Sequence, residues 1–129
     1  MVDFNEIVDP GVPFEPTVEP PEPREWKCRL AGVTFEGRQK NIERYALANA
    51  RYRLVRQPDN PYDTNAVMVT ANGRDVGHVP NSDRSGRIAD QIAPLIDAGC
   101  NLRVHFVRKL VNDKDLTKPT GLMVRIWEG

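Results

Sequence analysis

The dipeptide Asn72-Gly73, set between two apolar segments, is the feature that most restricts how this 129-residue chain can fold. Asn-Gly accepts the positive backbone angles of a two-residue turn, and it is the strongest short-range signal for a β-hairpin. The apolar and β-branched segment 66–71 precedes the turn, and the segment RDVGHVP follows it. We therefore predict two antiparallel strands joined at Asn72-Gly73.

Four other segments show the two-residue period that is typical of half-buried strands. Apolar side chains alternate with basic or polar ones in residues 26–30, 51–56, 102–108 and 121–127. In the third of these segments, Arg108 falls on the same face as Leu102, Val104 and Phe106. The polar residues 112–120 are expected to form the loop between the last two strands.

Two segments favour helices. Residues 42–47 could form one or two helical turns. A longer helix is predicted to start with Ser82 or Asp83 as its cap and to end at Gly99, because apolar residues recur at three- and four-residue steps between them. The chain is therefore expected to be mainly β, a small partly closed β-barrel of about six strands with one or two helices.

The first 25 residues differ from the rest in composition. They hold six of the eleven prolines and seven acidic residues against Arg24 alone. Each proline removes a backbone donor and fixes φ, so we expect a disordered or extended acidic tail over residues 1–25 and one domain over residues 26–129. The PxxP spacings at 13–16 and 20–23 leave open a ligand motif, but prolines in such a tract produce this spacing by chance.

Charge and hydropathy limit the classes of function. The formal net charge is zero, yet residues 26–129 carry 17 Lys and Arg against 11 Asp and Glu, which suits an anionic partner. No apolar run is long enough to span a bilayer, and the N-terminal residues lack the features of a signal peptide. We expect a cytoplasmic protein with no membrane partner and with reduced cysteines.

The residues that could hold a zinc ion stand alone in the sequence: Cys28, His78, Cys100 and His105. Structural zinc sites draw their ligands in close pairs, so this set predicts no zinc site. Asp59, Asp63 and Asp75 could bind magnesium, but the first two flank a turn that needs such side chains for its own hydrogen bonds. With no nucleophilic triad and no glycine-rich phosphate loop, we expect neither an enzyme nor a cofactor.

The segment NPYDTNAV, residues 60–67, puts a tyrosine in a turn that needs no ring. Together with GVTFEG before it and VGHVP after it, this segment resembles the HIRAN domain, which occurs alone in bacteria and viruses and at the front of some fork-remodelling ATPases. The resemblance covers about residues 27–108. It implies a modified OB-like β-barrel that binds the 3′ end of single-stranded DNA without catalysis, as an accessory to repair or replication alongside helicases, nucleases or repair proteins.

The resemblance also implies roles for individual residues. Tyr62 and Phe35 would stack on the terminal base, Asp63 would accept a hydrogen bond from the 3′-hydroxyl, and His78 would lie at the DNA backbone. Asn60 would fix the loop or contact the terminal nucleotide, whereas Asn65 and Ala66 are expected to be structural. The implied DNA-binding set is Thr34, Phe35, Asn60, Pro61, Tyr62, Asp63, His78 and Asn81.

Two positions depart from the pattern of the helicase-linked members. Thr34 replaces an arginine and Asn81 replaces a lysine, so two phosphate contacts are lost unless Arg38, Arg74 or Arg84 compensates. Phe35 keeps an aromatic face, and ordinary core packing is the alternative to stacking for this residue. The alternative function is a protein-interaction module that keeps the fold without binding DNA.

Overall fold

The computed structural model describes residues 24–129. The predicted acidic tail therefore lies outside the described residues, except for Arg24 and Glu25, and Glu25 is the first residue of a strand. In chain order the strands and helices are β1 Glu25–Arg29, α1 Arg38–Tyr45, β2 Tyr52–Gln57, β3 Ala66–Ala71, β4 Arg74–His78, the 3-10 helix Asp83–Ser85, α2 Ile88–Asp97, β5 Leu102–Leu110 and β6 Gly121–Glu128.

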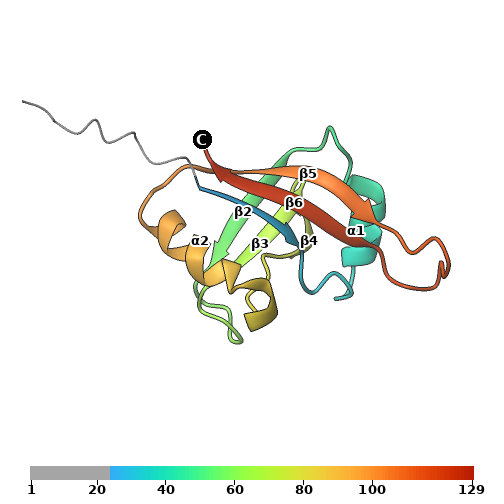
Figure 1. Cartoon of the computed structure of the whole chain (residues 1–129), viewed down its shortest axis with the longest axis horizontal. Helices are drawn as coiled ribbons and strands as arrows, with labels where there is room; N and C mark the ends of the chain where they lie inside the picture. Colours follow the sequence, from blue (N-terminus) through green and yellow to red (C-terminus); the bar gives the residue numbers. More distant parts are fainter. Residues whose placement is uncertain (1–23) are drawn as a thin grey trace, which may run out of the picture.

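The six strands form two antiparallel sheets of three strands each, in the orders β1-β6-β5 and β2-β3-β4. The helices α1 and α2 lie at opposite ends of the strands (Figure 1). A mainly β fold with six strands and two α-helices confirms the predicted class. The ladders do not join the sheets into a continuous barrel, and one isolated bridge, between Ala31 and His78, connects them.

The hairpin predicted at Asn72-Gly73 is confirmed. Asn72 and Gly73 have φ angles of 49° and 81°, which a tight two-residue turn requires. The Asn72 side chain also accepts a hydrogen bond from the backbone N–H of Arg51 at 2.8 Å, so the turn is tied to the start of β2. The segment that follows β4 is thereby held beside β3, where the Val79 N–H donates to the Val67 carbonyl.

The core lies between the two sheets and receives side chains from both of them and from both helices. Its fully buried large members are Ile42, Val67, Val69, Val76, Ile92, Leu122, Val124 and Ile126. The alternation predicted for the first strand is confirmed, because Cys28 and Leu30 are buried while Lys27 and Arg29 are exposed. In β5 a register shift between Phe106 and Arg108 breaks the alternation, so the expected inward position of Arg108 is wrong and its side chain is exposed.

The helix predicted to run from Ser82 to Gly99 is interrupted. Ser82 caps only the 3-10 turn Asp83–Ser85, and α2 begins separately at Ile88. Gly86 and Arg87 both adopt left-handed backbone angles, with φ of 80° and 51°, and such residues end a right-handed helix. Within residues 24–129 neither helix has the length and apolar character needed to cross a bilayer.

Gly77 in the VGHVP segment permits a close contact between the two sheets. Its φ is 151°, and a Cβ atom there would lie 3.0 Å from the Ala31 carbonyl oxygen and 3.1 Å from the Leu30 Cβ. Any larger residue would therefore push β4 away from the segment that follows β1. This contact places His78 next to Ala31, where two backbone hydrogen bonds of 2.8 and 3.0 Å join them.

Candidate nucleic-acid interface

A pocket of about 360 Å³ forms where the loop after β1, the loop between β2 and β3, and the segment after β4 meet. It brings together six of the eight residues predicted to contact DNA: Phe35, Asn60, Tyr62, Asp63, His78 and Asn81. Thr34 and Pro61 are exposed neighbours of this pocket in the sequence and are absent from its lining. Segments 31–35, 60–66 and 78–82 thus converge on one surface.

Two aromatic rings of this pocket are open to solvent. Tyr62 is 95% exposed and Phe35 is 63% exposed. Core packing, the alternative interpretation of Phe35, is therefore wrong. A large exposed aromatic side chain makes few apolar contacts within the protein, so its face remains available to a ligand. The Arg38 guanidinium lies 5.0 Å from the centre of the Phe35 ring and supports it from the protein side.

Asn60 fixes the loop that carries Tyr62. Its Oδ1 accepts hydrogen bonds from the backbone N–H groups of Tyr62 and Asp63, at 2.9 and 3.2 Å. Its Nδ2 donates to Gln57 Oε1 at 3.3 Å, which ties the loop to the end of β2. Asn60 was predicted either to fix the loop or to contact the terminal nucleotide, and these hydrogen bonds show that it fixes the loop. The exposed Tyr62 ring consequently projects from an ordered backbone.

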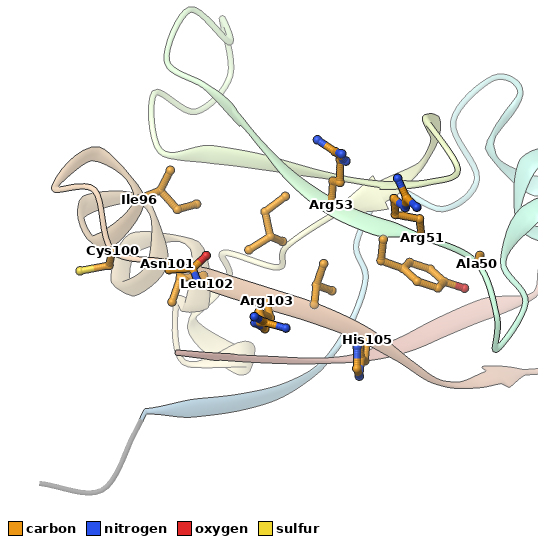
Figure 2. Close-up of a pocket in the computed structure, with 12 residues that line it drawn as sticks. Ala50, Arg51, Arg53, Ile96, Cys100, Asn101, Leu102, Arg103 and His105 are labelled. Atoms are coloured by element: carbon orange, nitrogen blue, oxygen red, sulfur yellow. The ribbon is translucent and has the colours of Figure 1, made fainter. Parts of the chain in front are cut away.

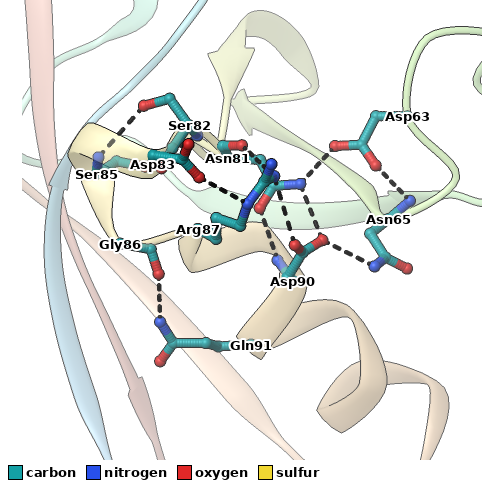
Figure 3. Close-up of polar contacts among 10 residues, drawn as sticks. All are labelled: Asp63, Asn65, Asn81, Ser82, Asp83, Ser85, Gly86, Arg87, Asp90 and Gln91. Carbon is teal, nitrogen blue, oxygen red and sulfur yellow. Dashed lines mark hydrogen bonds and ion pairs between the residues drawn. The ribbon is translucent and has the colours of Figure 1, made fainter.

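The Asp63 carboxylate is oriented by two hydrogen bonds (Figure 3). Oδ1 accepts from the Asn65 backbone N–H at 2.9 Å, and Oδ2 accepts from Asn81 Nδ2 at 2.8 Å. An ionised carboxylate has about four acceptor positions, so two remain for a ligand. Asp63 therefore presents a fixed acceptor at the edge of the pocket.

Asn81 connects Asp63 to the first turn of α2. Besides Asp63, its Nδ2 donates to Asp90 Oδ1 at 2.9 Å, and its Oδ1 accepts from the Asp90 N–H at 2.9 Å. Asn65 Nδ2 also donates to Asp90 Oδ1 (Figure 3). Hydrogen bonds from Asn65 and then from Asn81 lower the pKa of the Asp90 carboxyl. Asn81 thus has a positioning role that the sequence did not predict.

Arg38 is buried beneath the pocket and has three hydrogen-bond partners. It is 4% exposed, and its guanidinium donates to Asp75 Oδ1, to the Gly32 carbonyl and to His78 Nδ1 at 2.9, 2.9 and 2.8 Å. These contacts occupy the guanidinium of Arg38, one of the three arginines that could have replaced a lost phosphate contact. Arg74 lies over Tyr45, 5.0 Å from the ring centre, whereas Arg84 is exposed two residues after Ser82, which lines the pocket.

His78 is held in one neutral tautomer by its partners. A guanidinium can only donate, so the His78 Nδ1 must accept from Arg38 and the proton must lie on Nε2. Nε2 then donates to Gln57 Oε1 at 2.6 Å. Burial, and next the charge of Arg38, lower the pKa of His78. Both ring nitrogens are engaged, so a contact with the DNA backbone requires one partner to be exchanged.

This arrangement predicts a loss of stability in mild acid. Because the folded-state pKa of His78 lies below its usual value, the unfolded chain takes up the proton first as the pH falls. The His78 contribution is complete above about pH 6.5 and is lost as the pH falls towards the folded-state pKa, with a slope of at most about 1.4 kcal/mol per pH unit. Urea unfolding across this range should show a steeper pH dependence for the natural chain than for His78→Gln, and parallel profiles would contradict the arrangement.

Three residues shape the site in roles that the sequence did not predict. Arg38 lies four residues before the buried Ile42 on α1, and this helical spacing was the available signal for an inward position. Gln57 and Asp90 act through hydrogen bonds to His78, Asn60, Asn65 and Asn81, and no periodic pattern marks them. Among the described residues, no three His, Cys, Asp or Glu side chains are grouped so that they could hold a metal ion.

Comparison with known proteins gives one family and two similar solved structures. The sequence model of the HIRAN domain matches residues 26–121. The crystal structure of the HIRAN domain of human HLTF is similar with a TM-score of 0.55 at 19% identity, over 81% of this chain and 74% of that chain. A protein from Lactobacillus plantarum is similar with a TM-score of 0.50 at 17% identity, over 82% of this chain and all of that chain. No curated protein sequence matches this chain.

Proposed function

The chain belongs to the HIRAN domain family, a family of DNA-binding modules, and from this premise we propose that it binds the 3′-hydroxyl end of single-stranded DNA without catalysis. The observation that carries the proposal is a pocket lined by two exposed aromatic side chains and an oriented carboxylate. We also propose that the two sheets act as one OB-like unit and that the module assists repair or replication beside helicases, nucleases or repair proteins.

The aromatic rings would bind the terminal base. Phe35 and Tyr62 come from different loops and line the same pocket, so a base can contact both. Stacking on an aromatic side chain contributes about 1–3 kcal/mol per base and tolerates every base, because each base has a π-face. Binding of the end would therefore be independent of sequence.

Asp63 would distinguish the chemistry of the end. The carboxylate accepts a hydrogen bond from a 3′-hydroxyl, whereas a 3′-phosphate brings a second negative charge towards it. The bonds from Asn65 and Asn81 hold the acceptor in place before the strand arrives. This geometry favours a free hydroxyl over a phosphorylated end.

Charge outside the pocket would supply attraction for the phosphates. Residues 1–23 carry six Asp and Glu and no Lys or Arg, so residues 24–129 hold all 18 Lys and Arg against the remaining 12 Asp and Glu. The exposed Arg84 lies two residues after the pocket residue Ser82, and Arg29, also exposed, lies two residues before the pocket residue Ala31. Binding is expected to weaken with salt because phosphate contacts release counterions.

Asp63→Asn tests the proposed recognition of the end. The substitution keeps the shape but removes the charge, so affinity for a 3′-OH strand should fall and the preference over a 3′-phosphate strand should narrow. Fluorescence titration of both oligonucleotides measures the two effects. Asp59→Asn is the matched control, because Asp59 is an exposed residue of the same loop and the change removes the same charge. An unchanged preference of Asp63→Asn for the 3′-OH strand over the 3′-phosphate strand would contradict the role assigned to Asp63.

One observation favours a second candidate, a module that binds a protein partner on the same fold. The residues that line the pocket include no Lys or Arg, and the buried Arg38 is already engaged by Asp75, Gly32 and His78. An exposed aromatic pocket without cations also suits an apolar peptide. Equal and negligible binding of the 3′-OH and 3′-phosphate strands would favour this candidate.

A further inference from the structure

A second groove lies on the seam between β2 and β5, the strands at the edges of the two sheets (Figure 2). It has a volume of about 440 Å³ and shares no lining residue with the pocket that contains Tyr62. Tyr52 and Val104 on its floor are buried, and Leu54 and Leu102 beside them are half-buried. This β2–β5 groove is therefore a separate surface with an apolar floor.

Arginines flank the β2–β5 groove. Arg51 and Arg53 alternate with the inward residues of β2, and Arg103 does the same on β5, so their side chains point away from the core (Figure 2). Within residues 24–129, no ion pair joins any of these three side chains to a carboxylate. A groove with an apolar floor and cationic sides fits an acidic segment that carries apolar side chains.

The chain contains such a segment just before the described residues. Residues 12–19, VPFEPTVE, contain the pairs Phe14-Glu15 and Val18-Glu19, each an apolar residue followed by a glutamate. They belong to a stretch that has six acidic and no basic residues up to position 23. The composition of this segment complements that of the β2–β5 groove in both charge and apolar character.

Arg24, the first residue that the structure describes, lies close to the groove. The Arg24 carbonyl accepts a hydrogen bond from the Glu128 N–H at 3.1 Å, and Glu128 is the ladder partner of Leu102 in the groove. Two strand spacings separate Arg24 from Leu102, which is about 10 Å. Phe14 precedes Arg24 by ten residues, and an extended chain of that length reaches about 31 Å. The segment can therefore reach the groove.

We infer that residues 12–19 dock in the β2–β5 groove, with Phe14 and Val18 on its floor and Glu15 and Glu19 beside the arginines. Covalent linkage keeps the segment at high effective concentration, so modest contacts suffice to hold it there. The apolar floor and the position of Arg24 favour this occupant over a nucleic-acid strand, whose phosphates would gain from the arginines alone. The docked segment would cover the positive charge of the β2–β5 groove, which shares no lining residue with the pocket that contains Tyr62.

Paramagnetic broadening in the full chain tests the docking. A nitroxide is attached to Thr17→Cys in a Cys100→Ser background, where the remaining Cys28 is 5% exposed and burial raises the pKa of its thiol to about 12. The backbone amides of Arg53, Leu54 and Arg103 should lose most of their NMR intensity, while those around Tyr62 keep theirs. Arg51→Gln with Arg53→Gln should restore the intensity in the groove. The matched control, Lys40→Gln with Arg44→Gln, removes the same charge from the exposed face of α1 and should leave the broadening unchanged.

Three results would overturn the inference. Broadening confined to the amides near Arg24 would mean that the segment stays beside its attachment point. Equal recovery in the groove variant and the α1 control would mean that only net charge matters. If an added oligonucleotide shifts the groove amides while the nitroxide leaves them sharp, the β2–β5 groove is a nucleic-acid surface.

Discussion

Tyr62→Ala is expected to weaken binding of a single-stranded 3′-OH oligonucleotide by about 1–3 kcal/mol, which is about 5- to 150-fold in Kd. Tyr62 is 95% exposed, so removal of its ring costs almost no packing within the protein. The hydrogen bonds that shape the loop run from the Tyr62 and Asp63 backbones to Asn60 and survive the substitution. The measured loss should therefore report the stacking contact itself.

Two control variants and a measurement of Tm show whether the loss of affinity in Tyr62→Ala is specific to stacking. Tyr62→Phe keeps the aromatic face and should retain most of the affinity, because stacking needs the ring and not the hydroxyl. Leu116→Ala removes another exposed apolar side chain, on the loop between β5 and β6, and should change nothing. A fall in Tm of Tyr62→Ala by several degrees would show instead that the ring is structural.

Local signals accounted for most of the fold. The turn at Asn72-Gly73 needs only its own two residues to adopt positive φ, so the hairpin could be predicted without tertiary information. The interruption before α2 could not, because the left-handed Arg87 is fixed by contacts rather than by propensity. Its guanidinium binds Asp83 and the Asn81 carbonyl, which hold the backbone in a conformation that arginine rarely adopts.

The candidate site was predictable as a set of segments but not as a network. The NPYD turn and the VGHVP segment meet because the hairpin returns residue 79 beside Val67, and the hairpin itself was predicted. The bond between Asn81 and Asp63 joins residues 18 positions apart, with no periodicity that would relate them. The burial of Arg38 was missed for a different reason, since arginine is normally exposed and is buried only when it is paired.

Arg38→Ala is expected to lower the free energy of unfolding by about 3 kcal/mol, near the lower end of the cost of breaking a buried ion pair. The substitution removes the guanidinium donor from the Gly32 carbonyl, His78 Nδ1 and the Asp75 carboxylate. The Phe35 N–H still donates to the Gly32 carbonyl and the Gly77 N–H to Asp75 Oδ1, whereas His78 Nδ1 loses its donor. Asp75 is partly exposed and can regain water, which keeps the cost from the upper end of the range. Urea unfolding followed by the fluorescence of Trp26 and Trp127 measures the change.

Two variants separate this network from an ordinary ion pair. Arg125→Ala breaks an exposed pair with Glu25 and should cost no more than about 1 kcal/mol. Arg38→Lys keeps the charge but lacks the planar group that reaches three acceptors at once, so it should recover only part of the loss. A cost for Arg38→Ala no larger than that for Arg125→Ala would mean that water replaces the guanidinium freely. In that case Arg38 would not be what holds Phe35, whose ring it contacts, or what sets the tautomer of His78.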